Sequence, residues 1–326
     1  MARPREAESH GPAWLVQAGT IARRFYLDGR SKTEIADELG LSRFKVARIL
    51  DDARDLGLVE VSIRLPTHID PELSSAVQQA YGLRRAVVLE RSDDPLASVR
   101  ADLGRVAADL LSELATPADV LGLSCSRSVA ATTASLRSLA PCRVVQLTGT
   151  LAGPDTEAGS VESVRRAASV GGGQAFPLYA PMILPDAATA AALAGDPAIA
   201  QAVRQFGGVS IAMVAIGAWG PDLSTVWQTV GAAERRDLQR AGVVGEIGAR
   251  AFDVAGNAVA SSLDDRVLGI TLDQLRAIPE VVGLAFHADR AAAVRATLNG
   301  GLVDSLVCDA DLGRALVGST DERVTA

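Results

Sequence analysis

The stretch Ser31-Lys-Thr-Glu-Ile-Ala-Asp-Glu-Leu-Gly-Leu-Ser-Arg-Phe-Lys-Val-Ala-Arg-Ile-Leu50 decides the fold of the first part of the chain. Ser31 with Glu34 three residues later is the sequence signature of a helix that begins with a capping box. Gly40 ends this short helix, because a residue without a side chain suits the left-handed turn that follows a helix. Ser42 then caps a second helix. Helix, tight turn and helix in this order predict a helix-turn-helix, which places its second helix in the major groove of DNA.

The second helix of this pair is expected to run to about Leu56, with Gly57 as its stop. At helical spacing its apolar residues share one face: Val46, Ile49, Leu50, Ala53 and Leu56. The helix start and the opposite face carry the expected DNA contacts: Ser42, Arg43, Phe44, Lys45 and Arg48. We expect the cations to contact phosphates and base edges, and Phe44 to meet a thymine methyl group.

The rest of this domain is expected to contain one more helix, from Trp14 to Leu27, and a wing. The segment Leu58–Leu65 alternates like a strand, which predicts the wing, and Arg64 on it is expected to contact a DNA phosphate. The alternative is an ordinary three-helix domain with solvated charges. The succession of cap, glycine turn and second cap favours DNA binding over that alternative.

The composition indicates two domains and a sizeable core. The chain has 326 residues, of which 48% are apolar. No run approaches the roughly 20 consecutive apolar residues of a membrane helix, and the first residues lack the apolar segment of a signal peptide. Three widely spaced cysteines, Cys125, Cys142 and Cys308, argue against a zinc site and a disulfide framework. A cytoplasmic protein without a metal or cofactor is expected.

The net charge of −7 is distributed unevenly along the chain. Residues 1–66 contain 11 Lys and Arg against 10 Asp and Glu, which leaves 21 against 29 for the remainder. Because screening acts over roughly 8–10 Å, a local cationic face can bind phosphates despite distant acids. The acidic remainder should repel DNA, which favours specific docking over nonspecific binding.

A polar link between Pro66 and Pro71 is expected to separate two domains, a DNA-binding domain at 1–65 and an effector domain at 72–326, with 66–71 as the linker. Beyond the link, short apolar strands alternate with helices. This pattern predicts an α/β fold with a Rossmann-like, mostly parallel sheet covered on both faces. The expected strands are Ala86–Leu89, Val120–Leu123, Val144–Leu147, Ala175–Leu178, Val209–Ile216, Val282–Ala285 and Ser305–Val307.

Ligands of such sheets bind at the carboxyl ends of the strands. The loop Ser124–Ser128 follows an expected strand and opens into a helix, so its hydroxyls and amides, with Arg127, form a natural phosphate seat. Thr148-Gly149 ends the next strand in the same way. A purely structural capping role is the alternative for both loops. Glu246 is a candidate for holding sugar hydroxyls, whereas Asp253 has a turn-forming role as its alternative.

Taken together, these motifs resemble the SorC family of sugar-binding bacterial transcriptional regulators over nearly the full chain. The resemblance is carried by Ser42–Leu50 with Gly57–Val61, Gly122–Val129, Val145–Gly149, Leu178–Pro181, Ile216-Gly217, Val244–Gly248 with Phe252-Asp253, and Ala296–Val303. It implies a small winged helix-turn-helix domain and an effector domain related in fold to sugar-phosphate isomerases and deaminases. A phosphorylated sugar as effector, operator DNA as partner, and a homo-oligomer, dimer or often tetramer, are also implied.

The resemblance also implies the residues of the effector site. The phosphate would be held by Ser124, Cys125, Ser126, Arg127 and Ser128, helped by Thr148 and Gly149. Glu246 and Asp253 would lie near the sugar. Where relatives carry Gly-Gly and then lysine, this chain has Phe286-His287 and Arg290, so the cavity floor differs. Arginine can still bind a phosphate or a carboxylate bidentately.

The distribution of lysine excludes one mode of binding. The two lysines of the chain, Lys32 and Lys45, both lie in the first segment. Some related regulators hold an aldose phosphate through a lysine imine, which this effector domain has no lysine to form. Any sugar is therefore expected to bind noncovalently.

Two other functions fit parts of the sequence. One is a sugar-phosphate isomerase- or deaminase-like enzyme with a DNA-binding appendage, for which Asp253, Glu246 and His287 are candidate bases that no spacing groups together. The other is a thiol redox regulator acting through Cys125, which lies just before a helix. A ligand-responsive regulator, and not an enzyme, is the leading interpretation.

Overall fold

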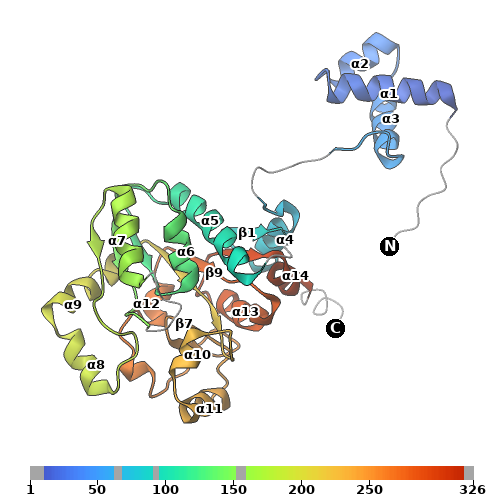
Figure 1. Cartoon of the computed structure of the whole chain (residues 1–326). Coiled ribbons are helices and arrows are strands. Elements are labelled where there is room, and N and C mark those ends of the chain that lie inside the picture. The colour runs from blue at the N-terminus through green and yellow to red at the C-terminus, as the bar shows by residue number, and fades with distance from the viewer. Residues whose placement is uncertain (1–10, 62–67, 91–94, 152–158, 319–326) are drawn as a thin grey trace. The chain divides into compact units, whose positions relative to one another are not determined.

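The structure is a computed structural model and describes residues 11–61, 68–90, 95–151 and 159–318. Contacts between Cα atoms divide the chain into unit 1, Met1–Pro66, and unit 2, Thr67–Ala326 (Figure 1). Each unit encloses its own hydrophobic core. Among the described residues, no helix is both long and apolar enough to cross a membrane.

Residues 11–61 of unit 1 form three helices, α1 (Pro12–Tyr26), α2 (Lys32–Leu39) and α3 (Arg43–Asp55). The capping box is formed as predicted, because the Ser31 Oγ accepts from the Glu34 N–H at 3.2 Å and the Glu34 carboxylate accepts from the Ser31 N–H at 2.8 Å. Gly40 follows α2 with a φ of 63°, the left-handed conformation that glycine adopts without strain. The helices enclose a core that includes Ala18, Ile21, Ile35, Val46 and Ala53.

The prediction of a strand directly after α3 is wrong where the structure describes it. Residues 58–61 form no strand. The N–H groups of Leu58 and Val59 instead both donate to the carbonyl oxygen of Ala53, at 2.9 and 3.1 Å, and so close the C-terminus of α3. The rest of the expected wing, including Arg64, lies outside the described residues.

Unit 2 contains a seven-stranded parallel sheet with the strand order β1-β10-β9-β5-β2-β3-β4. Every neighbouring pair is parallel, and each of the seven strands overlaps one of the seven predicted, which confirms the expected α/β class. The chain leaves β2 toward β3 on one side and returns to β5 on the other. The strands are β1 (Arg85–Leu89), β2 (Val120–Leu123), β3 (Arg143–Gln146), β4 (Ala175–Phe176), β5 (Ile211–Ala215), β9 (Glu280–Leu284) and β10 (Ser305–Asp309).

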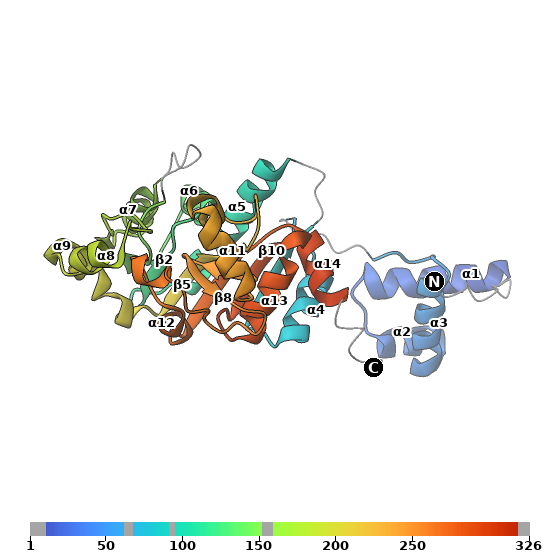
Figure 2. The same cartoon turned by 90° about the horizontal axis from the view of Figure 1, so that it is seen from below.

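Helices cover both faces of this sheet (Figures 1 and 2). One face packs against α5 (Leu96–Leu114), α6 (Arg127–Ser135) and α7 (Ser160–Gly171). The other packs against α4 (Pro71–Tyr81), α12 (Leu272–Arg276), α13 (Ala291–Asn299) and α14 (Ala310–Gly318). The remaining helices are α8 (Ala187–Ala194), α9 (Pro197–Val203), α10 (Thr225–Thr229) and α11 (Ala232–Arg240), with 3₁₀ turns at Phe206–Gly208, Asp264–Arg266 and Ala288–Arg290. Burial of every strand on two sides explains their continuous apolar sequences.

A small antiparallel sheet that the sequence did not predict follows the end of β5. It consists of β6 (Gly217–Ala218), β7 (Gly245–Ile247) and β8 (Arg250–Phe252). The turn between β7 and β8 contains Gly248 and Ala249, both with positive φ. These strands are too short to produce an alternating pattern in the sequence, which explains why they escaped prediction.

Part of the predicted link is integrated into unit 2. The Asp70 N–H donates to the Val88 carbonyl oxygen at 2.8 Å, and the Glu90 N–H donates to the carbonyl oxygen of His68 at 2.9 Å. The Asp70 side chain caps α4, which begins at Pro71. Residues 68–70 therefore pair with the last residues of β1 and with Glu90, which follows it.

Candidate functional site

Unit 2 has a cavity at the carboxyl ends of β2, β5 and β9, where the strand order changes direction. Its volume is about 70 Å³, measured as the space open to the centre of a water molecule, and one water needs about 10–15 Å³ on this scale. The walls come from the loop 124–128, from residues 215–217 and 284–286 at the ends of β5 and β9, and from the small sheet with α10. The cavity can therefore hold a small polar ligand.

The loop after β2 lines this cavity with all five of its predicted residues: Ser124, Cys125, Ser126, Arg127 and Ser128. It leads directly into α6, and the Ser126 Oγ caps that helix by accepting the Val129 N–H at 3.0 Å. The start of a helix presents backbone amides and the positive end of the helix dipole. An anion in the cavity thus meets hydroxyls, amides and a guanidinium on one wall.

Thr148 and Gly149 support this wall without lining the cavity. The Thr148 side chain is fully buried, and its Oγ1 accepts the N–H of Cys125 at 2.9 Å. A Cβ at Gly149 would lie only 2.5 Å from the carbonyl oxygen of Pro181, so a side chain there would displace the neighbouring backbone. Thr148 therefore positions the loop, whereas Gly149 allows the close approach of the backbone at Pro181.

Glu246 lies on β7 and forms part of another wall of the cavity. Its Oε1 accepts from the Ser224 hydroxyl at 2.9 Å, and its Oε2 accepts from the Ala249 N–H at 3.0 Å. Burial raises the pKa of the Glu246 carboxyl, and these two hydrogen bonds oppose the rise. A Cβ at Gly217 would lie 2.2 Å from Oε1, so the glycine makes room for this carboxyl.

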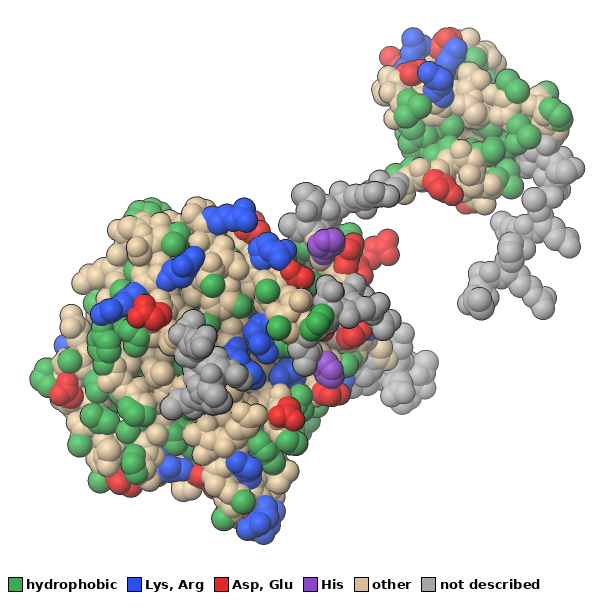
Figure 3. Space-filling model, viewed as in Figure 1, with side chains coloured by type: hydrophobic (Ala, Val, Ile, Leu, Met, Phe, Trp, Pro, Cys, Tyr) green, Lys and Arg blue, Asp and Glu red, His purple; other side chains and the backbone are tan. Residues whose placement is uncertain are grey.

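Three arginines line the cavity, Arg100 on α5, Arg127 on α6 and Arg290 after β9. The Arg100 and Arg290 guanidiniums lie 5.5 and 5.1 Å from the centroid of the Phe286 ring. Burial lowers the pKa of Arg290, and the charges of Arg127 and Arg100 lower it further. The side chains that Figure 3 shows in blue on unit 2 are all arginines, because both lysines of the sequence belong to unit 1. The charge of the lining favours an anionic ligand.

Two further predicted residues, besides Thr148 and Gly149, lie outside the lining of the cavity. Asp253 forms a turn, in which its Oδ1 accepts the N–H groups of Ala255 and Asn257, each at 2.9 Å. The bond from Asn257 is the main reason that the pKa of Asp253 lies below its usual range. The His287 side chain is exposed, next to Asp289. Of the three candidate bases, Glu246 alone lines the cavity.

Sequence reasoning missed Arg100 and Ser224 as parts of the site, whereas the family resemblance had pointed to Phe286 at the cavity floor. Arg100 lies within the first turns of a long amphipathic helix, where nothing in the spacing distinguishes it from a solvated arginine. Ser224 caps α10 through bonds to the Val226 and Trp227 N–H groups. Such a cap could be found in the sequence, but its contact with Glu246 joins segments 22 residues apart.

In unit 1, α3 exposes the residues that were predicted to meet DNA. The side chain of Phe44 is 85% exposed. Ser42, Arg43, Lys45 and Arg48 are also exposed, whereas Val46, Ile49 and Leu50 are buried. The first two turns of the helix therefore present one aromatic and three cationic side chains to solvent.

The chain matches known proteins along most of its length. Residues 67–318 match the family model Sugar-bind, described as "Putative sugar-binding domain". The Deoxyribonucleoside regulator of Bacillus subtilis is 25% identical over 300 residues, covering 91% of this chain and 95% of that protein. The Sorbitol operon regulator of Klebsiella pneumoniae is 26% identical over 309 residues, covering 91% and 96%.

Solved structures show the same fold. The full-length Sorbitol Operon Regulator SorC from Klebsiella pneumoniae superposes with a TM-score of 0.72 at 22% identity, covering 93% of this chain and 98% of that one. A domain of a possible sugar-binding transcriptional regulator from Arthrobacter aurescens TC1 gives a TM-score of 0.68 at 22% identity, covering 78% and 100%. At this level of identity the likeness concerns the fold.

Proposed function

The chain belongs to the sugar-binding domain family, and we propose that it is a DNA-binding transcriptional regulator whose operator affinity is controlled by noncovalent binding of a phosphorylated sugar. The two relatives described above, which match 91% of this chain, are named regulators, and LsrR of Escherichia coli, which matches 93% of it at 27% identity, is named a transcriptional regulator. The observation that carries the proposal is the cavity at the strand ends, which combines a helix start, three arginines and a buried carboxyl. The operator DNA places its site of action in the cytoplasm.

The proposed phosphate position is the loop Ser124–Ser128 at the start of α6. Phosphate binds helix N-termini because their amides and dipole favour negative charge. Arg127, the first residue of α6, adds a guanidinium on the same wall. Thr148 fixes the loop by accepting the Cys125 N–H.

The proposed sugar position is the wall formed by Glu246 and Ser224. The Ser224 hydroxyl and the Glu246 carboxyl are joined by a hydrogen bond of 2.9 Å and lie side by side at the cavity. Sugar hydroxyls suit such a pair, because each can both donate and accept a hydrogen bond. No lysine occurs after Lys45, so the sugar binds without an imine. Binding is reversible and follows the concentration of the metabolite.

The proposed output is DNA binding through α3. Its exposed Phe44, Arg48 and flanking cations are suited to base edges and phosphates of a major groove. A homo-oligomer, either a dimer or a tetramer, pairs these helices on two half-sites, as operator symmetry requires. The effector changes operator affinity when it binds one arrangement of the oligomer more tightly than another.

The proposal is tested with the full chain. Duplexes that it binds are selected from a random pool, and their affinity is then measured by fluorescence anisotropy with and without a panel of sugar phosphates. At least one phosphorylated sugar should change the affinity several-fold, while its unphosphorylated counterpart should not. If no duplex is selected, or if no member of the panel binds or has an effect, the proposal fails.

A further inference from the structure

Arg290 is a largely buried cation that is held in place by neutral groups. Its Nη1 donates to the carbonyl oxygen of Phe286 at 2.9 Å, and its Nη2 donates to that of Leu223 at 3.3 Å. The guanidinium also lies over the Phe286 ring. Among the described residues, no carboxylate forms an ion pair with it. Three of its five N–H groups remain for a ligand in the cavity.

A buried cation is unfavourable unless an anion meets it. The acids that attract Arg290 are Asp309 and Asp289, at longer range than an ion pair. The Asp309 carboxylate is engaged elsewhere, since it accepts the N–H groups of His287 and Leu312. The surroundings of Arg290 therefore favour an anionic group supplied by the ligand.

The position of Arg290 differs from that of the phosphate loop. Arg290 follows β9 and the loop follows β2, with β5 between them, so the two strand ends are roughly 10 Å apart at a strand spacing of about 4.8 Å. Arg290 also contacts Leu223, the neighbour of Ser224 on the sugar wall. A ligand with its phosphoryl group on the loop thus brings its other end to Arg290.

We propose that the effector is a phosphorylated sugar acid, whose carboxylate is bound by Arg290 while its phosphoryl group lies on the loop Ser124–Ser128. This inference rests on the proposed function. A guanidinium is planar and offers its N–H groups in one plane, which suits the two parallel bonds of a planar carboxylate, and its position over the Phe286 ring restrains it. The small cavity also favours a carboxylate over a second, bulkier phosphoryl group.

The test compares matched ligands by isothermal titration calorimetry on the full chain. Three pairs share a carbon chain and differ in the oxidation state of C1. They are erythronate 4-phosphate and erythrose 4-phosphate, ribonate 5-phosphate and ribose 5-phosphate, and gluconate 6-phosphate and glucose 6-phosphate; in the first pair both members are open chains. In at least one pair the acid should bind roughly 10- to 100-fold more tightly, the value of a charge-assisted hydrogen bond. Arg290→Gln should abolish this preference, because the acid phosphate loses affinity by a larger factor than the aldose phosphate when the guanidinium is removed. Arg314→Gln, an exposed arginine of α14, is the matched control.

The outcomes separate the two proposals. Equal affinities for acid and aldose phosphates in all three pairs, with binding present, overturn the sugar-acid assignment and leave the proposed function standing. Tightest binding of fructose 1,6-bisphosphate, lost in Arg290→Gln, overturns the carboxylate in favour of a second phosphoryl group. No binding of any phosphorylated ligand overturns the proposed function itself. The wild-type comparison decides the matter even if Arg290→Gln fails to fold.

Discussion

The Glu246 carboxyl accepts the backbone N–H of Ala249 at 3.0 Å, across a turn in which Ala249 is fully buried and has a φ of 65°. A non-glycine residue with this φ is strained, and such strain persists only where the surroundings hold it. Glu246 thus fixes the turn between β7 and β8 while it also faces the cavity. Glu246 therefore both holds the conformation of this turn and supplies a polar group to the cavity.

The first prediction concerns the pH dependence of stability. Burial raises the pKa of the Glu246 carboxyl in the folded protein above its ordinary value of 4.5. The folded protein therefore holds this proton more tightly than the unfolded chain does. The resulting contribution to stability is fully present below pH 4.5 and is lost as the pH rises through the folded pKa. Glu246→Gln mimics the protonated carboxyl. The variant should gain stability relative to wild type between pH 5 and 8, by about 1.4 kcal/mol for each unit of pKa shift. Urea denaturation measures the difference.

The control for this experiment is Glu113→Gln, an exposed carboxyl of α5. Its stability relative to wild type should stay nearly constant over the same range. A flat difference for Glu246→Gln as well would mean that burial does not raise the pKa of Glu246 and that this carboxyl is ionised in the folded protein.

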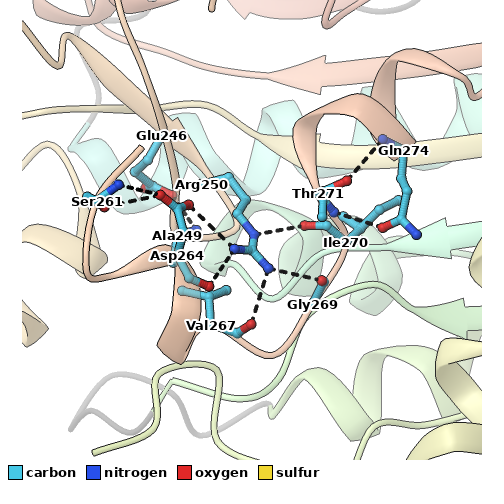
Figure 4. A network of polar contacts seen from close by, with 10 residues as sticks. All are labelled: Glu246, Ala249, Arg250, Ser261, Asp264, Val267, Gly269, Ile270, Thr271 and Gln274. Atoms are coloured by element: carbon cyan, nitrogen blue, oxygen red, sulfur yellow. Dashed lines mark hydrogen bonds and ion pairs between the residues drawn. The ribbon is translucent and has the colours of Figure 1, made fainter. Parts of the chain in front are cut away.

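The second prediction concerns Arg250, whose guanidinium joins the small sheet to the segment 264–270 (Figure 4). It donates to the carbonyl oxygens of Ile270, Asp264 and Val267 at 3.2, 2.8 and 3.1 Å. That segment is in turn bonded to the residues that follow β3, since the Gly149 N–H donates to the Leu268 carbonyl oxygen at 2.9 Å. Arg250 therefore connects the wall of Glu246 with the support of the phosphate loop.

Arg250→Gln should lower the free energy of unfolding by about 2–4 kcal/mol, because several buried carbonyl groups lose their donor. Ligand affinity should fall as well, although Arg250 does not line the cavity. Arg240→Gln, which removes an exposed arginine of α11, should change stability by less than about 0.5 kcal/mol. Equal stability of the two variants would contradict this role of Arg250.

The third prediction isolates the phosphate loop. Thr148→Val keeps the shape of the side chain and removes the oxygen that accepts the Cys125 N–H. Phosphate-containing ligands should bind roughly 5- to 10-fold more weakly, the equivalent of about 1 kcal/mol for one hydrogen bond. Thr297→Val, a buried threonine within α13 that donates to Val294, should leave ligand affinity unchanged in the same calorimetric titration. An unaltered affinity in Thr148→Val would show that Thr148 does not position the phosphate loop for binding.

The fourth prediction concerns α3. Arg48→Glu should weaken binding of selected DNA at least 10-fold, because a bidentate base contact is worth about 1–3 kcal/mol. Phe44→Ala should also weaken it, because the apolar contact with a thymine methyl group is lost. Both side chains are exposed, so the thermal midpoint of unfolding should shift little. Arg54→Gln, near the C-terminus of the same helix, is the control for loss of charge. Full operator affinity in Arg48→Glu would exclude that residue from the interface.

How much the sequence predicts differs between the sheet and the site. The seven strands of the large sheet were predictable, because burial on both faces demands short apolar runs such as Val120–Leu123. Ser31 and Ser42 located α2 and α3 by their capping chemistry. The loop Ser124–Ser128 was found because a polar turn between such a strand and a helix is recognisable locally.

The rest depends on contacts between distant segments. Arg100 and Arg290 meet at Phe286 across 190 residues of chain, which no local spacing reveals. The small sheet pairs segments only two or three residues long, so it leaves no periodic pattern. Asp253 matched a family motif but forms a turn, because the sequence alone does not distinguish a carboxylate facing a ligand from one that accepts local amides.

The proposed function requires energetic coupling between the cavity of unit 2 and the DNA-binding unit. The decisive measurement is the dissociation constant of one phosphorylated sugar for the full chain, free and saturated with its selected duplex. We predict that the two constants differ by roughly 5- to 150-fold, and that the sugar changes the dissociation constant of the duplex by the same factor. A sugar phosphate that binds with equal affinity to free and DNA-bound protein would contradict this coupling.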